Sequence, residues 1–256
     1  MSRLADKRVI ITGATGGIGK ATAAAFLEQG AKLMLVSRSA DRLAAMAAAL
    51  DGGDKVAVCA ADISEEEECR RYVDETMGRY GGIDVLFANA GTEGSIKPLI
   101  EMPAEEFDKV ILTNVRGSYL SLKHVIPQMI NGGGGSIIIT SSVAGRVGVP
   151  GLSAYATSKH AIIGLAQVAA LEYAEHGVRV NAIAPAPVDN EMMRSIEKQA
   201  APGAEDQARA GFEGLVAMKR YATNEEVAGL VTFLASDESG FCTSGVYAVD
   251  GGFLAA

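Results

Sequence analysis

Short runs of β-branched and aliphatic residues alternate with longer helical stretches along almost the whole 256-residue chain. Several runs are apolar at nearly every position, which is typical of parallel strands that helices cover on both faces. Strand–helix alternation with right-handed crossovers predicts a doubly wound, Rossmann-type α/β fold with a seven-stranded parallel sheet and helices on both faces. The expected strands are Arg8–Thr12, Lys32–Ser37, Lys55–Ala60, Asp84–Ala88, Gly135–Thr140, Val178–Ala184 and Gly245–Val249.

The helical stretches between these strands have recognisable starts. Two of them carry the Ser/Thr-x-x-Glu pattern of a capping box, Ser64 with Glu67 and Thr223 with Glu226. The chain length fits one large α/β domain, so residues 1–256 are expected to form a single unit. The expected helices are Gly17–Gln29, Ala40–Leu50, Glu65–Tyr80, Ala104–Ile130, Tyr155–Glu175 and Asn224–Ala235.

The stretch 186–218 breaks the alternation, because it contains no strand pattern but several bulky apolar residues. It directly follows the carboxyl end of a predicted strand, where open α/β sheets bind ligands. We therefore predict a movable lid over the substrate. The alternative is a helical pair that only packs on the surface.

Charge and composition exclude several classes of protein. The net charge of −8 argues against nucleic acid as a partner, because phosphate binding requires basic patches. No apolar run is long enough to span a membrane, and the N-terminal residues do not resemble a signal peptide, so a cytoplasmic protein is expected. The three cysteines and three histidines lack metal-ligand spacing, so no metal is expected.

A glycine-rich turn joins the first strand to the first helix, in the segment Thr12-Gly13-Ala14-Thr15-Gly16-Gly17-Ile18-Gly19. Glycines permit a sharp turn and a close approach to a pyrophosphate, and the helix N-terminus supplies N–H groups and a positive dipole end. This turn predicts a dinucleotide site with contacts from Gly13, Thr15, Gly17, Ile18 and Gly19.

The end of the second strand bears on the choice of nicotinamide cofactor. An acidic residue there would hold the free ribose hydroxyl of NAD, but the sequence has Ser37 and Arg38, with no carboxylate before Asp41. Arg38 can bind a 2′-phosphate through its planar, charged fork, and Ser37 can donate a hydrogen bond. NADP is therefore predicted. The alternative is NAD, with Arg38 a solvated surface residue.

Further candidate contacts follow the third and fourth strands. Asp62 is placed to accept from the adenine amino group, with Ile63 beside it, and Asn89-Ala90-Gly91 forms a tight turn near the cofactor. Either segment could instead be ordinary turn chemistry. Their positions at the carboxyl ends of strands favour binding.

Tyr155 and Lys159 lie four residues apart, so a helix places them on the same face. The ammonium favours the phenolate, and we expect it to lower the tyrosine pKa, which would let the phenol exchange a proton with an alcohol or carbonyl. Ser142 lies thirteen residues upstream. With the dinucleotide turn, these residues predict an enzyme that moves a hydride between a nicotinamide and a substrate C–O group.

In this order, the motifs resemble those of the short-chain dehydrogenase/reductase family, in its common short form, over nearly the whole chain. By that resemblance, Tyr155 is the general acid/base, Lys159 lowers its pKa and holds the nicotinamide ribose, and Ser142 polarises the substrate oxygen. Asn114 would hold a water in a proton relay through Lys159. The resemblance rests on Thr12-Gly13-x-x-x-Gly17-x-Gly19, Asp62, Asn89-Ala90-Gly91, Asn114, Ser142, Tyr155-x-x-x-Lys159, Asn181 and Pro185.

Two positions need separate comment. Asn114 has low helix propensity in the middle of a predicted helix, so a local distortion is expected there. After the sixth strand the family usually has Pro-Gly followed by a threonine, whereas this chain has Pro185-Ala186-Pro187-Val188-Asp189-Asn190. Pro185, Val188 and Asn190 are still expected to contact the cofactor, with Asn190 standing where a hydroxyl would reach it.

The substrate pocket is expected to combine 91–96, 143–152 and the lid. Its predicted lining residues are mainly apolar: Val143, Val147, Val149, Leu152, Met192 and Met193. A small to medium apolar ketone or secondary alcohol is the expected substrate, cyclic compounds included.

Other functions stay open at this point. One is a 3-oxoacyl-(acyl-carrier-protein) reductase, although the helix of Asn114 ends in Gln128-Met129-Ile130-Asn131 without the basic residues that often dock the carrier. Others are an NAD-dependent alcohol dehydrogenase and a non-catalytic NADP-binding protein, which would bind cofactor without turnover. The helix of Tyr155 is apolar nearly all round, and with the resemblance this predicts a homotetramer.

Overall fold

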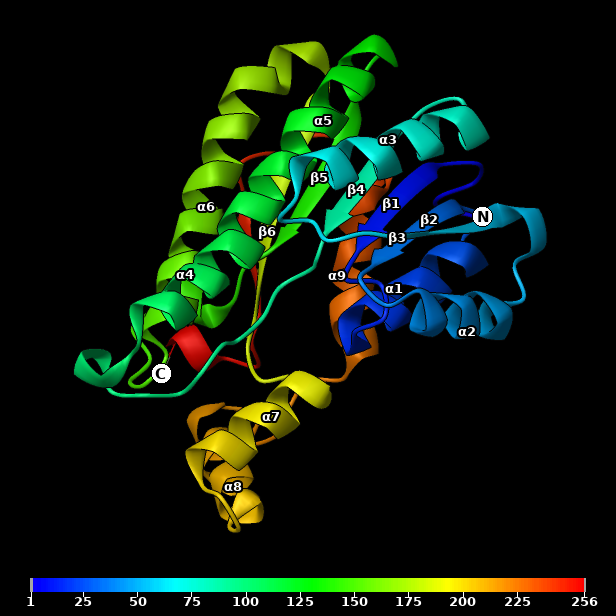
Figure 1. The fold of residues 1–256 in the computed structure, drawn as a ribbon. Helices are drawn as coiled ribbons and strands as arrows, with labels where there is room; N and C mark the ends of the chain where they lie inside the picture. Colours follow the sequence, from blue (N-terminus) through cyan, green and yellow to red (C-terminus); the bar gives the residue numbers. More distant parts are fainter. Residues whose placement is uncertain (1, 256) are drawn as a thin grey trace.

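The structure, a computed structural model, describes residues 2–255. Its seven strands form one all-parallel sheet in the order β3-β2-β1-β4-β5-β6-β7, as Figure 1 shows. The doubly wound fold expected from the sequence is confirmed. The strands are β1 Arg8–Thr12, β2 Lys32–Ser37, β3 Val56–Ala60, β4 Val85–Ala88, β5 Gly135–Thr140, β6 Val178–Pro185 and β7 Val246–Val249.

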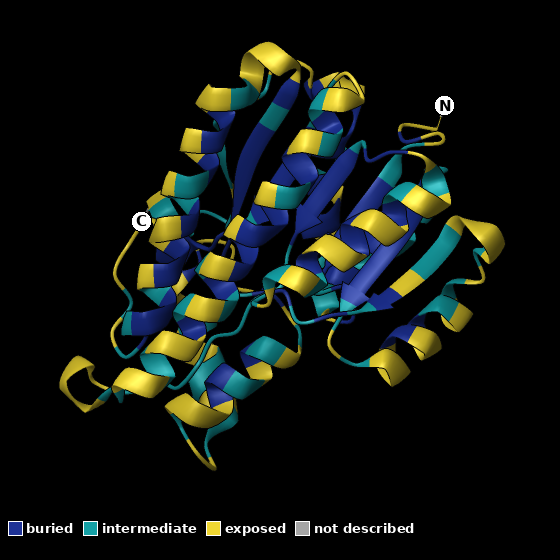
Figure 2. Cartoon of the chain, turned by 45° about the horizontal axis from the view of Figure 1, so that its top comes forward, coloured by how far each residue is buried: buried dark blue, intermediate teal, exposed yellow. Residues whose placement is uncertain are grey.

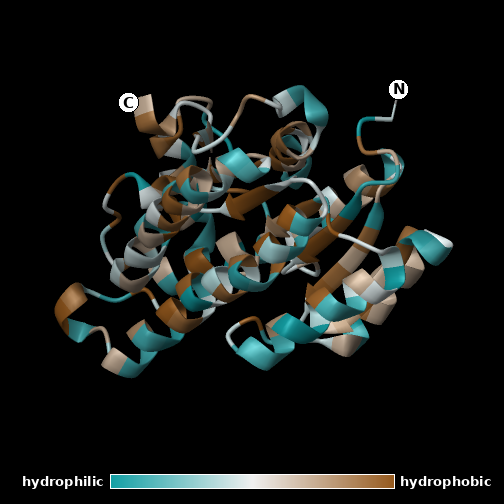
Figure 3. Cartoon of the chain, turned by 90° about the horizontal axis from the view of Figure 1, so that it is seen from above, coloured by the Kyte–Doolittle hydropathy of each residue, from teal (hydrophilic) through white to brown (hydrophobic). Residues whose placement is uncertain are grey.

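Helices cover both faces of the sheet, and Figure 2 shows most strands buried beneath them. Successive strand residues point to opposite faces, so Ile10 joins the core under α3, α5 and α6, while Val9 and Ile11 join the core under α1, α2 and α9. Figure 3 shows the hydrophobic strands between these layers. The helices are α1 Gly17–Glu28, α2 Ala40–Leu50, α3 Glu66–Tyr80, α4 Ala104–Ile111, α5 Gly117–Asn131, α6 Ser153–Tyr173, α7 Glu191–Ala200, α8 Glu205–Leu215 and α9 Asn224–Ala235.

The strand order reverses between β1 and β4. From β1 the chain builds outward to β3 on one side, then crosses back to place β4 against the other side of β1. At such a switch point the connections leave the sheet in opposite directions, so a crevice opens at the carboxyl ends of the two strands. Among residues 2–255, no helix has the length and apolarity needed to span a membrane.

The predicted helix Ala104–Ile130 is interrupted at the expected place. A π-helical turn, Leu112–Arg116, separates α4 from α5 and contains Asn114. A single π-turn inside an α-helix often marks a functional site. The local distortion expected from the low helix propensity of asparagine is therefore confirmed.

One predicted capping box is confirmed and the other is wrong. Thr223 accepts from the Glu226 backbone N–H, and the Glu226 side chain accepts from Thr223. Ser64 caps no helix, because α3 begins two residues later at Glu66. The Ser64 hydroxyl instead donates to Asp62 Oδ1 across 2.7 Å, in a local turn that competes with the cap.

The stretch 186–218 contains α7 and α8 and, as predicted, no strand. Figure 1 shows this helical pair beyond the carboxyl edge of the sheet. Asp189 links it by accepting from both Arg194 and Arg209, and Met193 and Ile196 pack with Phe212 between the two helices.

An ion pair between Arg8 and Asp84 joins the starts of β1 and β4. Asp84 accepts from the Arg8 backbone N–H at 2.7 Å, from Nε at 2.8 Å and from Nη2 at 2.7 Å. Burial alone would raise the pKa of the Asp84 carboxyl, but the hydrogen bonds and charge of Arg8 lower it below its usual value. The pair therefore stabilises the ionised carboxylate in the folded protein.

We predict that Asp84→Asn lowers the free energy of unfolding by about 2 kcal/mol at neutral pH, since it removes charge-assisted hydrogen bonds at a mostly buried carboxylate. Because the folded-state pKa is depressed, this stabilisation is present above the unfolded value of about 3.9 and is lost as pH falls through the folded value. Urea unfolding between pH 7 and pH 3 measures both effects.

The matched control is Asp54→Asn, which removes a fully exposed carboxylate that pairs with Arg79 across 3.4 Å. Solvent screens such a pair, so this control should leave the unfolding curve unchanged. A wild-type advantage over Asp84→Asn that is equal at pH 7 and pH 3 would contradict the assignment.

Candidate active site

A cavity of about 590 Å³ lies at the carboxyl edge of the sheet, between the strand ends and the α7–α8 pair. It brings together nearly all the residues selected from the sequence. The lining includes Gly13, Thr15, Gly17, Ile18, Ser37, Arg38, Asp62, Ile63, Asn89, Ala90, Gly91, Ser142, Tyr155, Lys159, Pro185, Val188 and Asn190.

Three other selected residues act from behind the cavity wall. Gly19 gives a close approach inside the glycine turn, because a Cβ there would collide with the Gly13 carbonyl oxygen. Asn181 is fully buried and ties β6 to the start of β7, since it donates to the Cys242 carbonyl at 2.8 Å and accepts from Gly245 N–H at 3.0 Å. The third is Asn114.

Asn114 is almost completely buried, and its amide clamps the loop after β4. Its Oδ1 accepts from Thr92 N–H at 2.8 Å, and its Nδ2 donates to the Thr92 carbonyl and to Ser158 Oγ, both at 2.9 Å. Ser158 in turn donates to the Tyr155 carbonyl at 2.7 Å. The side chain thus joins the π-turn, the cavity loop and the helix of Tyr155.

The glycine turn and the end of β4 are in direct contact. Gly13 has φ of +63°, and a Cβ there would lie 2.7 Å from Ala90 Cα. Thr12 Oγ1 accepts from the Asn89 and Ala90 N–H groups at 3.1 and 3.2 Å. Only glycine permits both this left-handed backbone and this separation, so the turn stays open toward the cavity.

The end of β2 forms the far wall of the cavity. The hydroxyls of Thr15 and Ser37 lie 2.9 Å apart. Burial alone would raise the pKa of the Asp62 carboxyl, but hydrogen bonds from Ser64 and the charge of Arg38 lower it. Arg38 therefore lies close enough to Asp62 to stabilise its ionised form.

Tyr155 lies in the first turn of α6, and Lys159 follows one turn later. The Lys159 Nζ donates to the Thr140 carbonyl at 2.7 Å and lies 5.5 Å from the centre of the Tyr155 ring. Ser142 Oγ accepts from Ala144 N–H at 3.1 Å, in the turn after β5. Helical spacing and the β5 end thus direct the three side chains to one part of the cavity.

The ionisation of Tyr155 differs from the sequence-based expectation. Burial raises the pKa of Tyr155 to about 12; a hydrogen bond with Ser142 opposes this rise, and the charge of Glu93 adds to it. Burial also lowers the pKa of Lys159 to about 8. The prediction that Lys159 lowers the tyrosine pKa is wrong in this structure, because removing both groups from water disfavours their charged forms.

Asn190 has a structural role that the sequence analysis missed. It is the N-cap of α7, where its Oδ1 accepts from Met192 and Met193 N–H at 3.1 and 3.3 Å. Asparagine directly before a helix is a common cap, so the signal was present in the sequence. Asn190 still lines the cavity, and a Cβ on Gly17 would lie 2.7 Å from Asn190 Cβ.

Several cavity residues were not selected from the sequence, among them Arg42 and Phe253. Arg42, in the first turn of α2, donates to the Thr15 carbonyl and to Glu191 on α7, both at 3.1 Å. Its position four residues after Arg38, in the first turn of a predicted helix, was the available signal. Phe253, from the C-terminal segment after β7, also lines the cavity.

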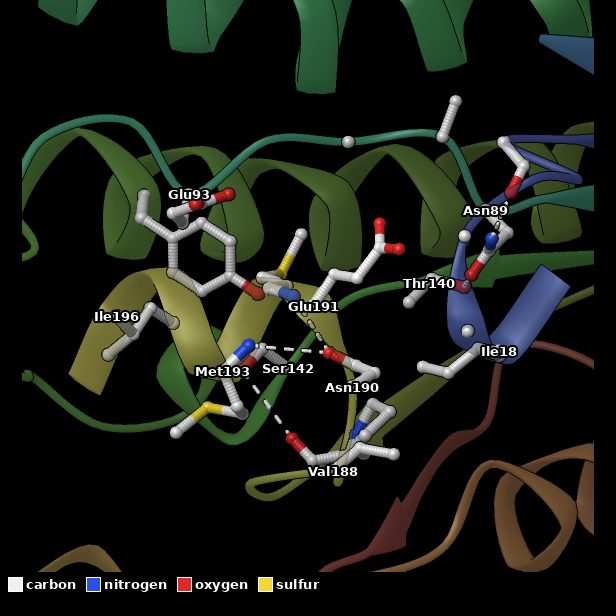
Figure 4. A pocket seen from close by; sticks show the side chains of 18 of the residues that line it. Ile18, Asn89, Glu93, Thr140, Ser142, Val188, Asn190, Glu191, Met193 and Ile196 are labelled. Atoms are coloured by element: carbon white, nitrogen blue, oxygen red, sulfur yellow. Dashed lines mark hydrogen bonds between the residues drawn. The ribbon is translucent and has the colours of Figure 1, made fainter. Parts of the chain in front are cut away.

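The remaining wall is mainly apolar, as expected. Val143, Val149, Leu152, Met192 and Met193 all line the cavity. Val147 does not belong to it, because its side chain is exposed on the loop after β5. Figure 4 shows Met193 and Ile196 of α7 on one side of the cavity and Glu93 on the other.

Comparison with known proteins identifies the family. The family model described as "Enoyl-(Acyl carrier protein) reductase" matches residues 13–254. The chain is 39% identical over 258 residues to levodione reductase of Leifsonia aquatica, with 100% of this chain and 97% of that protein covered. It is 37% identical over 257 residues to the 2,5-dichloro-2,5-cyclohexadiene-1,4-diol dehydrogenase of Sphingobium indicum, with both chains fully covered.

Solved structures agree with this assignment. The crystal structure of levodione reductase matches with a TM-score of 0.97, covering 99% of this chain and 100% of that one. The structure of NAD+-bound xylitol dehydrogenase, 34% identical, matches with a TM-score of 0.93, covering 98% of this chain and 100% of that one. The chain therefore belongs to the short-chain dehydrogenase/reductase family and is an oxidoreductase that acts on the CH–OH or carbonyl group of small molecules.

Proposed function

We propose that the protein transfers a hydride between NADP(H) and a small to medium, mainly apolar ketone or secondary alcohol. The observation that carries this proposal is one continuous cavity with two chemically different ends. Ser142, Tyr155 and Lys159 meet at one end, and Ser37 and Arg38 line the other. An extended dinucleotide fits such a layout.

The residues present suit a dinucleotide. Gly13 and Gly17 line the cavity without side chains, so the N-terminal N–H groups of α1 are accessible to a pyrophosphate. Ile18, Asp62, Ile63 and the Asn89–Gly91 turn would flank the adenosine and ribose groups. On the nicotinamide side we propose contacts from Pro185, Val188 and Asn190, with Lys159 on the ribose hydroxyls.

The catalytic roles follow from charge development. The cofactor, when bound, would supply the hydride, and negative charge would then grow on the carbonyl oxygen of the substrate. Ser142 and Tyr155 donate hydrogen bonds to that oxygen, and Tyr155 delivers the proton. A tyrosine whose pKa is about 12 carries its proton at neutral pH, which is the form that reduction requires. Asn114 holds the loop and helix that carry the site; its relay water stays a prediction.

We predict that Tyr155→Phe lowers kcat for ketone reduction by at least about 100-fold, because it removes the proton donor and leaves the apolar ring in place. The measurement is NADPH oxidation with a panel of linear and cyclic ketones. NADPH binding, followed by fluorescence, should survive the change. A variant that keeps its turnover would exclude Tyr155 as the acid.

The choice of NADP is supported by Arg38 and by the absence of an acidic residue at the end of β2. Arg38 is exposed and lies beside Asp62 and Ser37 at the cavity wall. Its planar guanidinium group could bind a 2′-phosphate there. NAD is the alternative, since the related xylitol dehydrogenase was solved with NAD+.

We predict that Arg38→Gln lowers kcat/KM for NADPH by about 10- to 100-fold, the range expected for lost charge-assisted hydrogen bonds to a phosphate. The value for NADH should stay nearly constant. Arg70→Gln, on the exposed surface of α3, is the matched control and should change neither value. Turnover only with NADH in the wild-type protein would refute the NADP assignment.

A cyclic substrate is supported by the relatives, whose names specify levodione and a cyclohexadiene-1,4-diol. A second candidate is a reductase of acyl-carrier-protein thioesters, which the description of the family model favours. Against it, α5 ends in Gln128-Met129-Ile130-Asn131, without a basic residue in its last turn. Side-by-side rates with cyclic ketones and β-ketoacyl esters distinguish the two.

We also propose that α7 and α8 act as the lid over the substrate. Gln199 on α7 donates to the Gly94 carbonyl at 3.3 Å and accepts from Ile96 N–H at 3.1 Å, so a few polar contacts fasten the pair to the cavity loop. Such contacts can open without disturbing the sheet. A cytoplasmic location stays a prediction.

A homotetramer is the proposed assembly, because large apolar side chains stand exposed on α6. Val168 and Leu171 are 54% and 79% exposed, and Tyr119 on the neighbouring α5 is 49% exposed. Such a patch on a helix pair favours burial against another copy. We predict a tetrameric mass by light scattering, and a monomeric mass would contradict the proposal.

A further inference from the structure

The substrate end of the cavity contains a carboxylate, that of Glu93, without a side-chain partner among the residues that the structure describes. Three carboxylates line the cavity: Asp62, Glu93 and Glu191. Asp62 accepts from Ser64, and Glu191 pairs with Arg42. Among residues 2–255, no side-chain hydrogen bond or salt bridge holds Glu93, although its surroundings are partly buried.

The backbone on both sides of Glu93 is firmly held. Thr92 makes two hydrogen bonds with the buried Asn114 amide, at 2.8 and 2.9 Å. Gly94 has φ of +69°, and a Cβ there would lie 2.5 Å from Val110 Cγ2, so the turn after Glu93 requires glycine. The Gly94 carbonyl also accepts from Gln199 on α7. Glu93 therefore lies in a firmly held loop, which contacts the π-turn on one side and the proposed lid on the other.

The carboxylate faces the reacting end of an apolar pocket. Glu93 lines the same cavity as Tyr155, and its negative charge adds to the rise in the pKa of Tyr155 that burial causes. Ile96, in the same loop, packs against both the Leu152–Tyr155 cluster and the Met193–Ile196 cluster. Figure 4 shows Glu93 across the cavity from Met193 and Ile196. A partly buried carboxylate beside apolar side chains lacks hydrogen-bond donors unless a ligand donates to it.

We propose that Glu93 accepts a hydrogen bond from a second hydroxyl group on the substrate, so that the preferred substrates are hydroxyketones and the corresponding diols. This inference rests on the proposed ketone/alcohol function and names its substrate class. A hydroxyl fits better than an ammonium, because the cationic Lys159 lines the same cavity and would repel a second cation.

The expected effect is a substrate preference rather than a loss of chemistry. A hydroxyl that donates to an ionised carboxylate makes a charge-assisted hydrogen bond, and a substrate without it leaves the carboxylate desolvated and unpaired. We expect kcat/KM for 3- or 4-hydroxycyclohexanone to exceed that for cyclohexanone by about 10-fold or more. Glu93 would thus determine specificity, while Tyr155 and Ser142 serve every substrate.

The test compares these ketones in wild-type protein, Glu93→Leu and Glu93→Gln, with NADPH and NADH in parallel. We expect Glu93→Leu to bring the ratio of hydroxylated to unsubstituted kcat/KM close to one while cyclohexanone is still reduced. Glu93→Gln keeps an acceptor without the charge and should give an intermediate ratio. Glu101→Leu, an exposed residue of the same connection outside the cavity, is the matched control and should keep the wild-type ratio.

The outcomes separate the two proposals. A wild-type ratio near one, or a ratio that Glu93→Leu leaves unchanged, overturns the role of Glu93 but keeps the reductase. A stronger preference for 4-aminocyclohexanone would assign Glu93 to a cation and overturn the hydroxyl. Failure of wild-type protein to reduce any ketone overturns the proposed function itself. Because the measured quantity is a ratio of two kcat/KM values within each variant, a general loss of stability does not change it. If Glu93→Leu fails to fold, the isosteric Glu93→Gln variant still tests the proposal.

Discussion

Thr12 and Gly13 pack directly against Asn89 and Ala90 at the point where the strand order of the sheet reverses, and the cavity depends on this contact. Gly13 meets the Ala90 backbone there without a side chain between them, so the backbone of both strand ends lines the same crevice. In a parallel sheet every strand delivers its carboxyl end to one edge. Glycine at the junction leaves that edge open for a ligand, whereas any larger residue at position 13 would meet Ala90.

The charged side chains that line the cavity differ between its two ends. At the β2 end Arg38 lies beside Asp62 and Arg42 pairs with Glu191, whereas Glu93 lines the substrate end. Between them, Tyr155 and Lys159 are buried, and burial raises the pKa of the tyrosine to about 12 and lowers that of the lysine to about 8. The proposed proton donor, Tyr155, is thus held neutral in a region of low polarity, where a hydrogen bond to a developing oxyanion is strong.

The proposed lid is connected to both ends of the cavity. Glu191 of α7 pairs with Arg42 beside the glycine turn, and Gln199 of the same helix bonds to the loop that carries Glu93. Asn190 caps α7 at the point where it leaves β6. One helix therefore touches the cofactor side and the substrate side, so its movement would expose both.

The sequence by itself determined the alternating architecture, the glycine turn and the neighbouring positions of Tyr155 and Lys159, because these depend on local periodicity and backbone sterics. It also indicated the distortion at Asn114 through low helix propensity. Local patterns gave a wrong prediction where two nearby groups compete for one side chain. The Ser64 hydroxyl donates to Asp62 and does not cap α3.

Only the tertiary structure decided the properties that arise from burial and from contacts distant in the chain. The direction of the Tyr155 pKa shift depends on removal from water, which the spacing to Lys159 does not report. The pairing of Arg42 with Glu191 and the placement of Phe253 in the cavity require segments far apart in sequence to meet. The same holds for the position of Glu93 in the cavity, where no side chain of residues 2–255 pairs with it. Spacing along one helix is a local quantity, whereas desolvation and cavity shape are set by all the elements that enclose a residue.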